Sequence, residues 1–173
     1  MTGGETGARW RSRAWRYGPV VILVALIFYG STGAMAASNT SRIIGPLVRW
    51  LFPDISEASL LVVHMVARKL GHFAVYGTLA LLAARAFLTS AQEFLSRRWL
   101  VSAFLLVACV ALADEFNQSF YDSRTGTIRD SLLDCAGGAT ALVVLHLWRG
   151  RKRRRSSRRV RPGKADRLIK HEV

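Results

Sequence analysis

The chain has 173 residues, 51% of them hydrophobic, and a formal net charge of +14. Its apolar residues form four long runs that leave no sizeable soluble domain, so the composition predicts an all-α membrane protein. Most of the charge lies at the two ends, with +3 over residues 1–16 and +10 over residues 149–173. Because basic residues flanking membrane spans act as topology determinants, the net charge does not predict nucleic acid as a partner.

Four apolar segments are each long enough to cross a hydrocarbon core that needs about 20 residues per helix. They are approximately residues 17–37, 70–89, 99–120 and 130–148. Ala34-Met35-Ala36 at the end of the first segment resembles a signal-peptide cleavage site, so the sequence leaves open whether this helix is retained. Before the second segment, Pro53 ends one short helix and Ser56 can cap another. We therefore expect a bundle of four transmembrane helices, with one or two short interfacial or re-entrant helices between helices one and two.

The distribution of basic residues also predicts the orientation. With four spans, the N-terminus, the connection holding Arg97 and Arg98, and the C-terminal tail all lie on one side. The positive-inside rule assigns that side to the cytoplasm of a bacterial cell (inner) membrane. The expected regions are a basic cytoplasmic N-terminus (1–16), a transmembrane domain (17–148) and a basic cytoplasmic tail (149–173). The composition of the tail predicts disorder and attraction to anionic lipids.

Polar residues follow one face of each of the last three spans, because their spacing keeps them within about 100° of one another on a helix. They are Arg68, Lys69, His72 and Tyr76 in the second span, Asp114, Glu115 and Gln118 in the third, and Asp130 and Asp134 in the fourth, with Arg124 in the preceding loop. The expected topology brings these span ends together on the outer side. Ionisable groups at this depth are costly unless they are paired or functional. We therefore predict an outward-facing polar cluster.

The residue types in this cluster are compatible with two kinds of site. A ligand-binding site would use donors and charged groups that suit phosphate or carboxylate, namely Arg68, Lys69, Tyr76, Gln118, Arg124 and Asp134. A catalytic site would use His72, oriented by Asp114 or Asp130, or a pair of carboxylates such as Glu115 and Asp134. A third interpretation is an ion-pair network that only holds the helices together. Two to four of the carboxylates together with His72 could also hold a divalent metal, but the sequence lacks a strong metal-ligand motif such as His-Glu-x-x-His, so we predict neither a metal nor a cofactor.

The segments RKLGHFAVYGTLALL, DEFNQSFYDSRTGTIRD and DSLLDCAGG resemble the VanZ-like family of small bacterial membrane proteins. The family pattern is Lys-x-x-His-x-x-x-Tyr, then Asp-Glu-x-x-Gln, an Arg, and Asp-x-x-x-(Asn or Asp)-x-x-Gly. In this chain the pattern falls on Lys69, His72, Tyr76, Asp114, Glu115, Gln118, Arg124, Asp130, Asp134 and Gly137. The resemblance covers roughly residues 20–148, and Asp134 stands where Asn is common. It implies four or five membrane helices and a role in the cell envelope.

The namesake of that family is associated with resistance to the glycopeptide teicoplanin. We therefore expect an envelope protein whose polar cluster binds a lipid-linked or amphipathic ligand and contributes to such resistance. The expected partners are membrane lipids, with a lipid-linked cell-wall precursor or a lipoglycopeptide as candidate ligands. Two alternatives stay open: a membrane-embedded hydrolase or transferase acting on an envelope lipid, and a structural scaffold or transport subunit.

Overall fold

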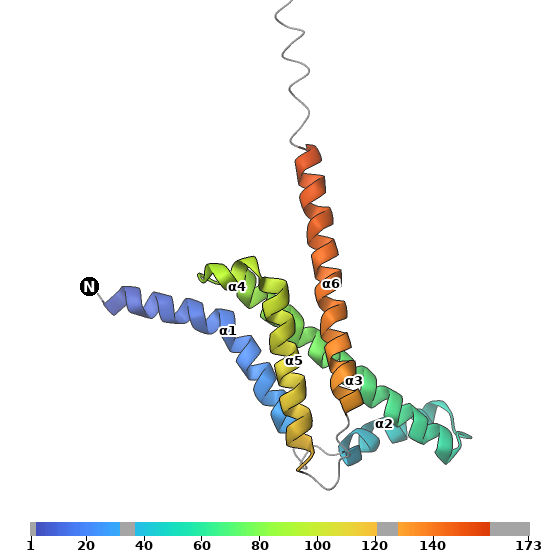
Figure 1. Ribbon diagram of the computed structural model, residues 1–173. Helices are drawn as coiled ribbons and strands as arrows, with labels where there is room; N and C mark the ends of the chain where they lie inside the picture. Colours follow the sequence, from blue (N-terminus) through green and yellow to red (C-terminus); the bar gives the residue numbers. More distant parts are fainter. Residues whose placement is uncertain (1–2, 32–36, 121–127, 160–173) are drawn as a thin grey trace, which may run out of the picture. The chain divides into compact units, whose positions relative to one another are not determined.

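The computed structural model describes residues 3–31, 37–120 and 128–159, and all regular secondary structure in these ranges is α-helical (Figure 1). The helices are α1 (Gly3–Ser31), α2 (Ala37–Leu51), α3 (Glu57–Leu88), α4 (Glu93–Arg97), α5 (Trp99–Gln118) and α6 (Ile128–Arg159). Within the described ranges, four stretches are long and apolar enough to cross a membrane: Trp10–Ser31, Glu57–Leu88, Trp99–Gln118 and Arg129–Lys152. These helices confirm the predicted fold class and its four spans.

The region before the second span differs from expectation in one respect. Helix α2 is the expected short helix, and it ends at Leu51, just before Pro53. Ser56 caps α3 as predicted, since its side chain accepts a hydrogen bond from the backbone N–H of Ser59 at 3.2 Å. However, α3 then continues for 32 residues, so the predicted second short helix and the second span are one helix. The physical reason is that no proline interrupts the hydrogen-bond ladder between Glu57 and Leu88.

Helix α6 is also longer than the predicted fourth span. It begins at Ile128, with Asp130 in its first turn, and remains helical to Arg159. Disorder was predicted for residues 149–173, and the described part of that segment, 149–159, is helical instead. Arginine and lysine are good helix formers, so a helix already established in the span can extend through them. The chain divides into two compact units, Met1–Leu142 and Val143–Val173, and the polar cluster belongs to the first.

Helix α3 is the centre of the first unit, and it packs against α1, α2 and α5. Its buried face consists mainly of small residues below Tyr76, all with an exposed fraction of 0%: Leu79, Ala80, Ala83, Ala84 and Ala86. Helix α5 also buries small residues, with Ala103 and Val107 0% exposed and Ala111 1% exposed. Small residues let helix backbones approach closely, which is a common basis of helix association in membranes.

Two glycines bring α6 directly against its neighbours. A Cβ atom added to Gly137 would collide with the backbone carbonyl oxygen of Phe73 and lie 3.0 Å from its Cα atom. A Cβ atom added to Gly138 would lie 2.7 Å from Cγ1 of Val107. The backbone of α6 therefore touches α3 on one side and α5 on the other. This close contact fixes where the first turns of α6 place their side chains.

Candidate functional site

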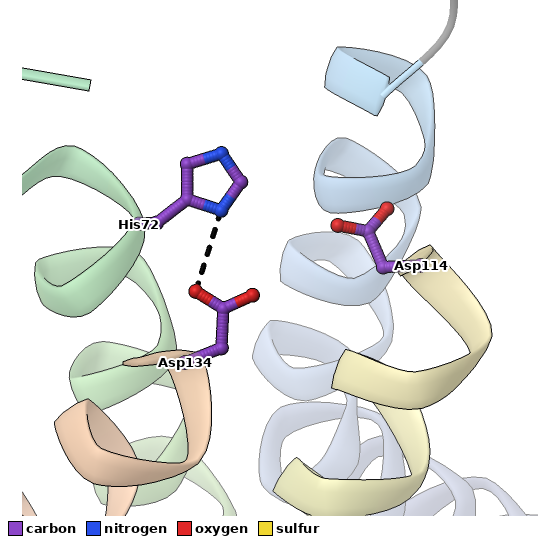
Figure 2. A group of neighbouring side chains, drawn as sticks. All are labelled: His72, Asp114 and Asp134. Carbon is purple, nitrogen blue, oxygen red and sulfur yellow. Dashed lines mark ion pairs between the residues drawn. The ribbon is translucent and has the colours of Figure 1, made fainter. Parts of the chain in front are cut away.

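Three polar side chains from three different helices meet inside the first unit. His72 comes from α3, Asp114 from α5 and Asp134 from α6, and Figure 2 shows them directed toward a common space. One ligand atom from each residue lies within 4.8 Å of the other two. Asp114 and Asp134 are almost completely buried, with exposed fractions of 1% and 2%. The His72 side chain is less buried and keeps 27% of its surface exposed.

Asp114 is held by hydrogen bonds to one of its two carboxylate oxygens. The hydroxyl of Tyr76 donates to Oδ2 at 3.1 Å, and the amide Nε2 of Gln118 donates to the same oxygen at 3.0 Å. Gln118 also donates to the hydroxyl of Ser31 at 3.4 Å, which connects α1 to the cluster. The other oxygen, Oδ1, is buried and has no hydrogen-bond partner among the described residues. Asp114 is thus fixed in orientation while one oxygen remains available.

Asp134 faces His72 directly. Its Oδ1 atom lies 3.3 Å from Nδ1 of His72, within ion-pair distance. The contact lacks the geometry of a hydrogen bond, so Oδ1 has no hydrogen-bond partner in the described part of the chain. An ion pair flanks the three residues, with Nη2 of Arg68 4.0 Å from Oδ2 of Asp130. Arg68 and Asp130 are more exposed than Asp134, since 40% and 24% of their side-chain surfaces are accessible.

The partner of His72 is Asp134, and not Asp114 or Asp130 as the sequence suggested. The cause is the register between α3 and α6. Because Gly137 rests on Phe73, Asp134, about one turn earlier on α6, comes level with His72. Spacing within each helix shows which residues share a face, but it does not set this register.

The other predicted site residues have different positions. Glu115 is half-buried near the cluster, and its Oε1 atom has no hydrogen-bond partner within the described ranges. Lys69 is exposed and does not join the buried residues, although it lies near Tyr76 around the helix, because it is seven residues, or about 10 Å, earlier along α3. Arg124 falls outside the described residues. The structure therefore brings together His72, Tyr76, Asp114, Gln118 and Asp134, with Arg68 and Asp130 alongside.

Two buried serines near the cluster were not predicted from the sequence. Ser31 is 3% exposed at the end of α1, and Ser131 is 3% exposed in α6, where its hydroxyl donates to the carbonyl of Ala111 at 3.4 Å. Ser31 follows the first apolar run on the side to which the topology assigns the cluster. This position could have identified Ser31 from the sequence, because the last residue of a span on this side can reach the polar residues of the other spans.

The charged groups of the site determine what it can bind. Two buried carboxylates face a single imidazole, and each carboxylate has an oxygen that accepts no hydrogen bond from the described residues. Such oxygens can accept hydrogen bonds from a ligand, accept a proton or coordinate a cation. A charge buried within membrane spans is costly unless it is paired or neutralised.

These features define a multi-pass membrane protein with a buried polar cluster at the junction of three of its spans. The chain matches the VanZ/LLP1 family model over residues 17–149, and it belongs to that family. It is therefore a VanZ-like envelope protein, as the sequence motifs indicated. Searches of curated proteins and of solved structures gave no match.

Proposed function

We propose that this VanZ-like protein binds the polar headgroup of a lipid-linked or amphipathic envelope ligand at His72, Asp114 and Asp134. The observation that carries the proposal is the pair of buried carboxylate oxygens without hydrogen-bond partners in the described structure. A headgroup with hydroxyl or amino groups would donate hydrogen bonds to them. Arg68 beside the cluster suits a phosphate or carboxylate on the same ligand. A lipid-linked cell-wall precursor and a lipoglycopeptide both combine these groups with an acyl or prenyl chain.

The length of α3 supports a position near the membrane surface. Its 32 residues extend about 48 Å at a rise of about 1.5 Å per residue, whereas the hydrocarbon core is about 30 Å thick. His72 precedes the last helical residue, Leu88, by sixteen positions, or about 24 Å. A helix that meets one boundary near Leu88 therefore places His72 about 6 Å inside the other boundary. An amphiphile anchored in the bilayer can present its headgroup at that depth.

The proposal includes the orientation, with both termini in the cytoplasm and the cluster at the outer leaflet. Labelling of introduced cysteines tests it. We expect a membrane-impermeant maleimide added to intact cells to label Asp54→Cys and to leave Glu93→Cys unlabelled, because these exposed residues lie beyond opposite ends of α3. Both variants require a background in which Cys109 and Cys135 are replaced by serine. The reverse labelling pattern would overturn the orientation.

Binding of a fluorescent polyprenyl-diphosphate-linked cell-wall precursor to the purified full chain in nanodiscs tests the ligand class. We expect Asp134→Asn and Arg68→Gln each to weaken binding about 10-fold, which corresponds to about 1.4 kcal/mol for one lost charge-assisted contact. Arg49→Gln is the matched control, because Arg49 is an exposed arginine paired with Glu57 at 2.7 Å, away from the cluster. Equal affinities for all three variants and the parent chain would contradict the proposal.

The same variants test a contribution to teicoplanin resistance. In a susceptible host, expression of the parent chain and of Arg49→Gln should raise the inhibitory concentration of teicoplanin, whereas Asp134→Asn should not. Equal membrane levels of the three proteins, measured by immunoblot, are the control for expression. Resistance that persists in Asp134→Asn would separate this activity from the cluster.

The contact between His72 and Asp134 supports a second candidate, a membrane-embedded hydrolase or transferase. A partly accessible imidazole beside a buried carboxylate is the arrangement of a general acid or base with its orienting group. The nanodiscs used for binding can also be assayed for turnover of the labelled precursor. Product formation that requires His72 would favour the enzyme over a binding protein.

A further inference from the structure

The His72, Asp114 and Asp134 side chains form a donor set suited to a metal ion. Imidazole nitrogen and carboxylate oxygen are the ligands that zinc and similar divalent transition-metal ions accept. The three residues come from α3, α5 and α6, and one ligand atom from each lies within 4.8 Å of the others. Ligand atoms around a tetrahedral zinc ion lie about 3.3–3.6 Å apart, given bonds of about 2.0–2.2 Å. Small side-chain rotations are sufficient to close that difference.

The hydrogen bonding of the two carboxylates independently indicates that each has an oxygen free to bind a further group. Oδ1 of Asp114 and Oδ1 of Asp134 are both buried, and neither accepts a hydrogen bond from the described residues. Oδ2 of Asp114, in contrast, accepts two hydrogen bonds, from Tyr76 and Gln118. This is the arrangement found around metal ligands, in which outer groups orient a carboxylate by one oxygen and leave the other for the ion.

The charge balance also favours a cation. The two buried carboxylates face one imidazole, and the guanidinium of Arg68 beside them pairs with Asp130, at 4.0 Å. Two carboxylates close together in a span repel each other and lose hydration. A divalent ion would compensate both charges at once.

We propose that His72, Asp114 and Asp134 bind one divalent transition-metal ion, with Zn²⁺ or Mn²⁺ as the fitting class. Catalytic metal sites typically have three protein ligands and one remaining coordination position for water or substrate. Here the exposed part of His72 marks the open side of the site. With the ion bound, the headgroup would reach the site through the ion, a phosphate oxygen taking the remaining position in place of direct hydrogen bonds to Oδ1 of Asp114 and Asp134, and this last step rests on the proposed function.

Metal binding can be measured on the full chain purified in detergent without chelators. Isothermal titration with Zn²⁺, and separately with Mn²⁺, should give about one ion per chain for one of them. Asp114→Asn and Asp134→Asn should weaken this binding by at least about 10-fold, since each removes a negatively charged ligand. Glu93→Gln is the matched control, because Glu93 is an exposed carboxylate paired with Arg97 at 2.6 Å. Binding of neither ion by the parent chain, or unchanged binding in both asparagine variants, would overturn the proposal.

A conservative variant keeps the test decisive if an aspartate variant fails to fold. Tyr76→Phe removes only the hydroxyl that donates to Asp114, so it should fold and bind the ion about 10-fold more weakly. Co²⁺ provides a spectroscopic readout, because a low-coordinate cobalt site absorbs strongly in visible light. The parent chain should show this absorption and His72→Gln should lose it. An absorption identical in His72→Gln would overturn the assignment of His72 as a ligand.

Measurements of precursor binding with and without metal distinguish the proposed metal site from the proposed function. Precursor binding that persists unchanged after removal of metal by EDTA would overturn the role of the ion and leave the proposed function standing. Specific metal binding by the three residues, without any precursor binding, would support the metal site and overturn the proposed ligand. Loss of precursor binding in EDTA and its recovery with Zn²⁺ or Mn²⁺ would support both.

Discussion

Replacement of Gly137 by alanine should lower the free energy of unfolding by about 1–3 kcal/mol, the usual cost of overpacking a close contact. The added methyl group would meet the backbone of Phe73, which cannot rotate away as a side chain would. Helices α3 and α6 must then separate, and His72 loses its contact with Asp134. We expect unfolding in mixed micelles of SDS and dodecyl maltoside, followed by tryptophan fluorescence, to show the loss.

Gly71→Ala is the matched control for this prediction. Gly71 lies in the same region of α3, but nothing lies within 4 Å of the position that its Cβ atom would take. Alanine is a better helix former than glycine by up to about 1 kcal/mol, so this variant should be as stable as the parent or more stable. Equal effects of the two substitutions would show that the backbones of α3 and α6 do not touch at Gly137.

Two substitutions of Asp114 should differ from each other in stability by about 2–4 kcal/mol, with Asp114→Leu less stable than Asp114→Asn. Both remove the charge, so the comparison isolates the hydrogen bonds. Asparagine retains an acceptor for Tyr76 and Gln118, whereas leucine leaves the Tyr76 hydroxyl and one amide N–H of Gln118 without this acceptor, at about 1–3 kcal/mol each, and Gln118 keeps only its hydrogen bond to Ser31. The micelle assay described for Gly137 provides the measurement. The expected difference is smaller than the sum because leucine packs as an apolar side chain.

The asparagine variant then separates folding from function. It should fold like the parent chain and still lose the proposed cation, because its amide group replaces a charged ligand. Equal stability of Asp114→Leu and Asp114→Asn would mean that the hydrogen bonds of Asp114 do not hold the bundle together. Loss of folded protein in both variants would favour the interpretation of the cluster as a purely structural network.

The sequence predicted the spans and much of the cluster because both follow from simple periodicity. Apolar length identified four spans, and helical spacing placed His72 with Tyr76, and Asp114 with Gln118, on shared faces. It did not exclude Lys69, because Lys69 lies only about 20° from Tyr76 around the helix and differs from it in position along the helix axis. Spacing shows which residues share a face, but it does not show how far along α3 the neighbouring helices cover that face.

The position of α6 along α3 could not be predicted from the sequence, because a backbone contact at Gly137 determines it. The same limit explains why the sequence did not single out His72, Asp114 and Asp134 as one set of candidate ligands. Motif searches detect ligands that are close together in the sequence, whereas His72, Asp114 and Asp134 are spread over three helices. The unbroken course of α3 was missed for another reason, because hydropathy ends a span at the membrane boundary while a helix continues until its hydrogen bonds are interrupted.

The alanine-rich face of α3 below Tyr76 has a consequence for how an ion or headgroup could enter and leave the site. From Leu79 to Ala86, the residues that face the other helices are fully buried and apolar, and they offer no ligand to a moving ion. The proposed ion or headgroup at His72 would therefore leave by the route on which it arrived. In sealed vesicles, occupancy should respond to the solution on a single face, and a concentration gradient across the bilayer should drive no net flux.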